Sequence, residues 1–116
     1  MKIIIKGQLP DLNTEINELK KHWAIYAKHK KYWTQYIAME IKRQKIGQIK
    51  PPIAPKFTWF TKNERMDCDN ISFAKKYILD GLVLAEIIPN DSRKYVIGFQ
   101  DCFEVDKNNP RVEIEV

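Results

Sequence analysis

The stretch from Leu12 to Gln44 contains neither proline nor glycine, and this constrains the fold more than any other feature of the chain. Apolar side chains recur along its first half at intervals of three or four residues, as they do on one face of an α-helix. We therefore expect Asp11, or alternatively Asn13, to begin one long helix, or two helices with a break near Lys28–Lys31, whose apolar face packs in the core. The apolar residues concerned are Leu12, Ile16, Leu19, Trp23 and Tyr26.

The remaining segments predict a sheet and a second helix. Apolar residues at helical spacing indicate a shorter helix over Ile71–Ala85, and the prolines of Gly47–Pro55 make that segment a connector. The elements together predict a single domain over residues 1–116 that combines helices and strands, an α/β fold in the broad sense and α+β in the strict one. Its mixed sheet of about four or five strands is covered by the two helical regions. The segments with the composition of strands are Lys2–Lys6, Lys56–Thr61, Lys94–Gln100 and Arg111–Val116.

Charge is divided unevenly along the chain. Residues 1–56 carry twelve Lys or Arg against four Asp or Glu, whereas residues 57–116 carry eight against eleven. Positive charge in one half favours a polyanionic partner, and acidic residues in the other half favour a metal ion. No apolar run approaches the length of a membrane span, and two lone cysteines are typical of a reducing compartment. We expect a cytoplasmic protein that binds neither a membrane nor an organic cofactor.

The basic first half holds the candidates for binding nucleic acid. The run Lys28–Lys31 lies among tyrosine and tryptophan residues, and cations beside aromatic rings are typical of proteins that hold phosphates and bases. Trp23 and Trp33 lie at helical spacing, however, and tryptophans in that pattern more often belong to the core. His22 and His29 have no carboxylate between them in the sequence, so we expect them in solvent. The predicted phosphate contacts are Lys28, Lys30, Lys31, Lys42 and Arg43.

An acidic motif stands before the second predicted helix. Asp67 and Asp69 are two residues apart, so in an extended backbone both carboxylates leave on the same face and favour a shared cation. Asp69 or Asn70 is expected to cap the helix, which would place the pair where a strand meets a helix N-terminus. Asp91 lies in a Pro-Asn-Asp-Ser turn. Taken singly, each aspartate is better explained as a cap or a turn residue; their joint appearance in a basic protein favours a site.

These residues carry a resemblance to the RusA family of Holliday junction resolvases, which are often encoded by prophages. The resemblance covers roughly residues 57–116, and the basic N-terminal half is similar only in general character. It rests on Asp67-x-Asp69-Asn70, on a helix with Lys76 and then Asp80-Gly81-Leu82, and on Asn90-Asp91 beyond that helix.

The resemblance implies a homodimeric, magnesium-dependent endodeoxyribonuclease that cuts four-way DNA junctions. It implies that Asp67, Asp69 and Asp91 bind Mg²⁺ and act in catalysis together with Lys76. Many family members have fewer residues between the Asp-Asn pair and the lysine, which leaves Lys75 as an alternative to Lys76.

The chemistry of phosphodiester hydrolysis agrees with this interpretation. Carboxylates that hold Mg²⁺ can activate a water molecule and compensate the charge of the transition state, provided that the three aspartates meet within a few ångströms. A four-way junction has two-fold symmetry, so a homodimer is expected to make the paired nicks. Two other functions stay open: a non-catalytic module that binds branched DNA or other nucleic acid, and a subunit whose basic helix meets an acidic protein partner.

Overall fold

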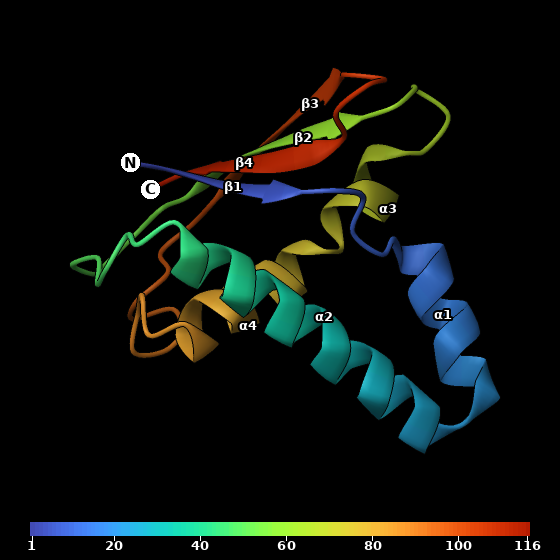
Figure 1. Ribbon diagram of the computed structural model, residues 1–116, viewed down its shortest axis with the longest axis horizontal. Coiled ribbons are helices and arrows are strands. Elements are labelled where there is room, and N and C mark those ends of the chain that lie inside the picture. Colours follow the sequence, from blue (N-terminus) through green and yellow to red (C-terminus); the bar gives the residue numbers. More distant parts are fainter.

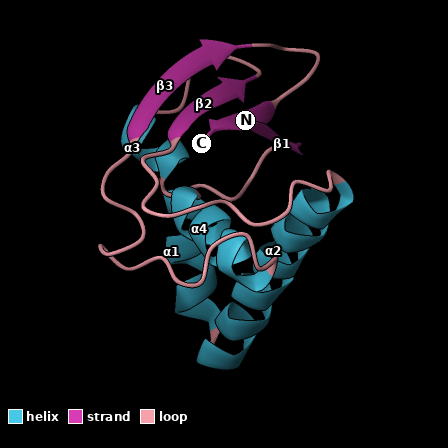
Figure 2. Cartoon of the chain, turned by 90° about the vertical axis from the view of Figure 1, so that its left-hand side faces the viewer, coloured by secondary structure: helices cyan, strands magenta, loops and turns pink.

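The computed structural model describes all 116 residues and has an α+β fold in which helices cover one face of a four-stranded mixed sheet (Figure 1). Figure 2 shows the same layers from the side, with the strands above the helices. The predicted α+β class and the mixed sheet are confirmed. The elements are β1 (Lys2–Lys6), α1 (Leu12–Lys21), α2 (Trp23–Arg43), β2 (Lys56–Thr61), α3 (Cys68–Ser72), α4 (Lys75–Leu84), β3 (Gln100–Val105) and β4 (Arg111–Glu115). None of the helices combines the length and the apolar character needed to cross a membrane.

The strands lie in the order β1-β4-β2-β3. β4 runs antiparallel to both β1 and β2, whereas β2 and β3 are parallel. Side chains alternate between the two faces of the sheet, and every second residue of the three strands β1, β2 and β4 is buried against the helices. The buried residues on this face are Ile3, Ile5, Phe57, Trp59, Val112 and Ile114.

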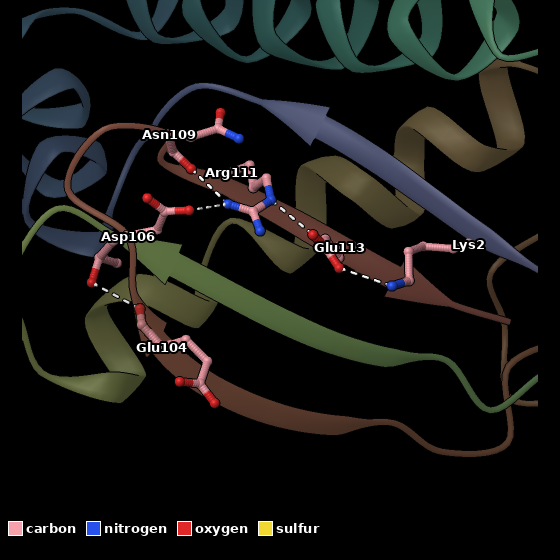
Figure 3. A network of polar contacts seen from close by, with 7 residues as sticks. Lys2, Glu104, Asp106, Asn109, Arg111 and Glu113 are labelled. Atoms are coloured by element: carbon pink, nitrogen blue, oxygen red, sulfur yellow. Dashed lines mark hydrogen bonds and ion pairs between the residues drawn. The ribbon is translucent and has the colours of Figure 1, made fainter.

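The other face of the sheet is held by a network of charged side chains (Figure 3). The Arg111 guanidinium donates hydrogen bonds to Asp106 at 2.8 Å and to Glu113 at 2.7 Å. Lys2 lies 3.1 Å from the second oxygen of Glu113, which links β1 to β4. The hydrogen bond from Arg111 lowers the pKa of Glu113. This face is therefore stabilised by ion pairs between neighbouring strands and the β3–β4 turn.

Both helical regions are divided differently from the prediction. Asp11 caps α1 as expected, since its Oδ1 accepts the Thr14 N–H at 2.7 Å. The expected break near Lys28–Lys31 is wrong: the helix breaks at His22, whose backbone is extended and whose Nδ1 accepts the Ala24 N–H at 3.2 Å. The predicted single helix over Ile71–Ala85 is also wrong, because the chain forms α3 and α4 with a tight turn between them.

The strand predicted over Lys94–Gln100 is wrong as well. Within that segment Val96 forms an isolated bridge with Ile53, and only its last residue, Gln100, belongs to a strand, which continues to Val105. β3 pairs with β2 along its whole length, from Lys56 opposite Gln100 to Thr61 opposite Val105. The position of β3 is therefore set by its partner strand, which the local sequence does not reveal.

α1 packs on the rest of the chain through a charged residue. Glu15 is only 3% exposed, and its Oε1 lies 2.7 Å from Nε2 of His29 on α2. The Tyr77 hydroxyl of α4 is buried, and burial together with the nearby Glu15 carboxylate raises the pKa of Tyr77. The expectation that His29 lies in solvent is wrong. Trp23 is 75% exposed, so its assignment to the core is wrong too.

The most extensive contact between helices in the fold is that of α2 with α4. Gly81 of α4 is buried and faces Ile37 of α2. A methyl group added at Gly81 would lie 2.6 Å from Ile37 Cγ2 and 3.4 Å from the Ala38 backbone nitrogen. The absence of a side chain therefore allows the two helices to lie this close together.

Substitution Gly81→Ala is expected to lower the free energy of unfolding by about 1–2 kcal/mol, because the cost of overpacking exceeds the gain in helix propensity. Urea denaturation measures the change. The matched control is Gly98→Ala, where no atom lies within 4 Å of an added methyl group and the stability should hold or rise slightly. Equal stability of the two variants would contradict the role given to Gly81.

Candidate functional site

Lys76 lies on the first turn of α4 between two aspartates. Its Nζ donates a hydrogen bond to Asp80 Oδ1 at 3.0 Å, one helical turn further along, and lies 3.9 Å from Asp91 Oδ2. The hydrogen bond to Asp80 raises the pKa of Lys76 above its usual value of 10.5, so the ammonium group stays charged. The Lys76 side chain is 54% exposed. The structure thus brings together a lysine and an aspartate that the sequence analysis had named as site residues.

The end of α4 determines where Asp91 lies. The Ile87 N–H donates to the Leu82 carbonyl at 2.9 Å and the Glu86 N–H donates to the Val83 carbonyl at 3.0 Å, with Glu86 at a φ of 61°. These two bonds form a Schellman motif, which reverses the chain at a helix C-terminus. The buried residue Ile87 then anchors the returning segment in the core. The chain that carries Asp91 is therefore directed back alongside α4.

Lys75 occupies a different environment from its neighbour. Its side chain is only 13% exposed, and its Nζ lies 2.5 Å from Asp101 Oδ2 on β3 and 4.0 Å from the centre of the Phe99 ring. Asp101 also accepts a hydrogen bond from the Trp59 indole at 2.9 Å. Lys75 therefore fastens α4 to the sheet. Of the two candidate lysines, Lys76 is the one that reaches solvent beside an acidic site residue.

Asp67 and Asp69 lie at the start of the five-residue helix α3. Asp67 is the N-cap residue with an extended backbone, and its side chain makes no capping hydrogen bond. Asp69 is already helical, and its Oδ1 accepts the Asn70 N–H at 3.0 Å. The expected capping by Asp69 or Asn70 is therefore wrong, as is the expectation that the pair lies on one face of an extended segment. Both carboxylates are exposed.

Asn70 fixes α3 against the N-terminal helix. Its side-chain oxygen accepts the Asn13 N–H at 3.1 Å. The Asp67 carbonyl accepts the N–H groups of Asn70 and Ile71, each at 3.1 Å, which closes the first turn of α3. Asp67 and Asp69 therefore lie on a short helix whose first turn is hydrogen-bonded and which is fixed to α1 through Asn70.

The structure does not gather the three aspartates into one cluster. It contains no group of three or more His, Cys, Asp or Glu side chains placed to hold a metal ion together. The donor chemistry of Asp67, Asp69 and Asp91 suits Mg²⁺, which prefers carboxylate oxygens. Their arrangement is not that of a complete magnesium site, because Asp91 pairs with Lys76 and the other two lie on α3.

A groove between α2 and α4 adjoins Lys76. One part of the groove has a volume of 550 Å³ and is lined by Lys30, Lys31 and Asp80. A second part has a volume of 470 Å³ and is lined by Lys42 and Arg43. The two parts share Gln35 and Leu84, so they are successive stretches of one depression, which we call the α2–α4 groove.

Four of the five residues predicted to contact phosphates line the α2–α4 groove. The fifth, Lys28, is exposed on α2 outside it. Asp80 lines the groove and accepts a hydrogen bond from Lys76. Lys76 therefore lies next to the groove that the basic side chains of α2 line. Asp101 was missed by sequence reasoning, since its contacts with Lys75 and Trp59 depend on the pairing of β3 with β2.

Comparison with models of protein families gave no match, and no curated protein matched the sequence.

Lys75→Met is expected to lower the free energy of unfolding by about 1–3 kcal/mol, because Asp101 loses its cationic partner in a half-buried position. The matched variant Lys76→Met should change stability by no more than about 0.5 kcal/mol, since Lys76 forms exposed ion pairs. Chemical denaturation of both variants tests the distinction. If Lys76→Met were the more damaging substitution, the structural roles of the two lysines would be reversed.

Proposed function

We propose that the chain is a magnesium-dependent, structure-specific endodeoxyribonuclease that resolves Holliday junctions by paired nicks in DNA recombination and repair. The observation that carries the proposal is the position of Lys76, whose ammonium group lies between Asp80 and Asp91 beside a groove lined by basic residues. Phosphodiester hydrolysis needs preorganised positive charge where the phosphate reacts. The resemblance to the RusA family named the same lysine and the same Asp91.

DNA binding is assigned to the α2–α4 groove. Lysine and arginine side chains along one groove neutralise successive phosphates, and such contacts position a duplex without reading its sequence. Recognition would therefore depend on the phosphate backbone and on the shape of the junction. The residues assigned to it are Lys30, Lys31, Lys42 and Arg43, with Lys28 at the exposed side of α2.

Lys76 is assigned to stabilise charge at the reacting phosphate. A lysine with a raised pKa is a poor proton donor at neutral pH, because it holds its proton too tightly. A fixed positive charge, by contrast, stabilises the extra negative charge of the transition state without any proton transfer. Asp80 keeps the ammonium charged and oriented, and Asp80 itself lines the α2–α4 groove.

The residues that would hold Mg²⁺ are Asp67, Asp69 and Asp91. When bound there, the ion would lower the pKa of a coordinated water molecule and compensate charge on the phosphate. Because Asp91 lies beside Lys76 and the other two aspartates lie on α3, the proposal requires Asp91 to turn towards α3 when the site is loaded.

A homodimer acting in the cytoplasm completes the proposal. The two strands of a four-way junction that must be cut are related by a two-fold axis, and two copies of one site related by the same symmetry would make opposed nicks. A single copy would nick only one strand.

A second candidate function is a module that binds branched DNA without cutting it. It is favoured by the separation of the three aspartates, since a binding module needs no metal site. Both candidate functions use the same basic groove, so only an assay of DNA cleavage distinguishes the nuclease from the binding module.

We expect the purified protein to nick a synthetic four-way junction on opposed strands in the presence of Mg²⁺, and to leave it intact without Mg²⁺. A linear duplex of the same sequence should not be cut. Asp69→Asn should lower the nicking rate by about 100-fold or more, and Lys76→Met by about 100-fold, because each removes charge compensation at the phosphate. Gel analysis of end-labelled strands measures the rates.

Glu64→Gln is the matched control, because Glu64 is an exposed acid in the loop before α3. It should nick at the rate of the unsubstituted protein. Tight junction binding with no magnesium-dependent nicking would exclude the nuclease and leave the binding module.

Lys31→Ala should weaken junction binding and reduce the slope of log K against log salt by about 1, since one phosphate contact is lost. Fluorescence anisotropy at several salt concentrations measures the slope. Lys107→Ala, an exposed lysine in the β3–β4 turn, should leave the slope unchanged. An unchanged slope for Lys31→Ala would remove α2 from the DNA interface.

A further inference from the structure

The sheet has two edge strands, and the fold protects only one of them. At the β1 edge, the Gln44 side chain of α2 donates to the Ile4 carbonyl at 2.7 Å and accepts the Ile4 N–H at 3.0 Å. The Tyr36 hydroxyl of α2 donates to the Lys6 carbonyl of the same strand at 2.9 Å. β3 forms the opposite edge of the sheet (Figure 1), and β2 is the only element with which it makes extensive contact. The β3 edge is therefore open.

The open edge consists of the backbone groups of every second residue of β3. The Gln100 N–H donates to the Pro55 carbonyl at 3.1 Å, and the Asp106 N–H donates to the Thr61 carbonyl at 2.8 Å. Residues of a strand address its two neighbours alternately, so the even-numbered residues bond to β2. The N–H and C=O groups that point outward are consequently those of Asp101, Phe103 and Val105. Such a row of unpaired groups is a template for a further strand.

β3 lacks the features that usually prevent an edge strand from pairing. It contains no proline and no lysine, and it pairs with β2 one residue to one residue, without a bulge. Its inward charge, Asp101, is already paired with Lys75. Nothing in the strand itself therefore opposes the addition of another strand.

On the side of the sheet that faces the helices, the open edge is apolar. Phe103 and Val105 lie on this side, because Phe103 pairs with Trp59, whose side chain is buried against the helices. Val105 is 49% exposed, and together with α3 and the loop before it these two residues line a hollow of 460 Å³. A strand placed along this edge would direct every second side chain to the side of the hollow, so those side chains should be apolar. The apolar lining residues are Met66, Cys68, Ile71, Phe103 and Val105.

The charge beside the open edge is negative. Glu104 lies on β3, and Figure 3 shows its carboxylate directed away from the Arg111 network. Glu64 lies in the loop before α3, and both acids line the hollow, which no lysine or arginine lines. Neither carboxylate belongs to an ion pair, unlike Asp106 and Glu113 nearby. The edge therefore suits lysine or arginine side chains and disfavours DNA phosphates.

A second copy of β3 does not meet these requirements. β3 contains two acids, Asp101 and Glu104, and no cation. Pairing β3 with itself would add a second unpaired Glu104 to an edge that already carries one, and like charges on adjacent strands are destabilising. The strand that fits the edge is basic and belongs to a different segment.

We propose that the β3 edge binds an extended segment of another protein in which apolar side chains alternate with lysine or arginine. The segment extends the sheet as a further strand, with main-chain hydrogen bonds to Asp101, Phe103 and Val105. Its apolar side chains lie over the hollow, and its basic side chains lie on the side of Glu104. The proposal concerns a surface apart from the α2–α4 groove, so it goes beyond the proposed nuclease function and does not depend on it.

Fluorescence anisotropy of the full chain with a labelled peptide, Lys-Val-Lys-Val-Lys-Val-Lys, tests the proposal without DNA or Mg²⁺. The peptide should bind with a Kd of about 10–300 μM, the range open to one short strand. The matched peptide Lys-Lys-Val-Val-Val-Lys-Lys has the same composition and charge without the alternation. It should bind at least about 10-fold more weakly, because it cannot direct its valines to one side.

Val105→Pro tests the hydrogen bonds of the open edge. Proline removes the outward N–H and leaves the bonds to β2 intact, which is where proline is tolerated in an edge strand. The variant should bind the alternating peptide at least about 10-fold more weakly, whereas Val105→Thr, which keeps the N–H, should bind within about 3-fold of the unsubstituted protein. Circular dichroism checks that both variants fold.

Glu104→Lys tests the charge and should weaken binding at least about 10-fold, because it places like charges side by side. Glu86→Lys is the matched control, since Glu86 is an exposed acid at the end of α4. It should bind like the unsubstituted protein. The proposal is overturned by absence of binding at 300 μM, by equal binding of the two peptides, or by folded Val105→Pro and Glu104→Lys variants that bind normally. Self-association of the chain that Val105→Pro abolishes would also overturn it, because a second copy would then occupy the edge.

Discussion

The close approach of α2 and α4 at Gly81 is the contact on which the rest of the site depends. Because no side chain separates Gly81 from Ile37, α4 lies deep enough against α2 for a groove to form between their outer faces. The same approach brings Asp80, the residue before Gly81, to the wall of that groove. A larger residue at Gly81 would move α4 outward and separate Lys76 from the basic side chains of α2. Of these two adjacent residues, Gly81 allows the helices to pack closely and Asp80 lines the groove.

Two adjacent lysines show how α4 serves both the core and the site. Successive residues of a helix point in directions about 100° apart, so Lys75 and Lys76 cannot share an environment. Lys75 points to the sheet and is held by Asp101, while Lys76 points to solvent and to Asp91. The rotation of α4 about its axis is set by its buried residues, with the Lys75–Asp101 contact in addition, and the direction of Lys76 follows from that rotation.

The sequence predicted the elements whose structure is decided locally. Lys2–Lys6 and Lys56–Thr61 are strands at their predicted bounds, and Asp11 caps its helix, because β-branched runs and capping oxygens act over a few residues. The failures involve partners distant in the chain. β3 is placed by β2, and α1 is oriented by the pairing of Glu15 with His29, which periodicity alone assigns to the opposite face. Lys76 and Asp91 were named as site residues through a family resemblance, but their contact with each other was not predicted, and the Lys75–Asp101 contact had no signal in the sequence.

The proposed magnesium site would require the three aspartates to come closer together, and their present contacts differ. Asp67 and Asp69 are carried by α3, whose backbone is fixed by the hydrogen bond between Asn13 and Asn70, whereas the Asp67 side chain makes no capping hydrogen bond and is free to turn. The segment of Asp91 follows buried Ile87 and Ile88, but its side chain is held only by Lys76 at 3.9 Å. Lys76 keeps its shorter bond to Asp80 if Asp91 turns away. In the proposed site, Asp91 can therefore turn away from Lys76 without breaking the hydrogen bond that keeps Lys76 charged and beside the groove.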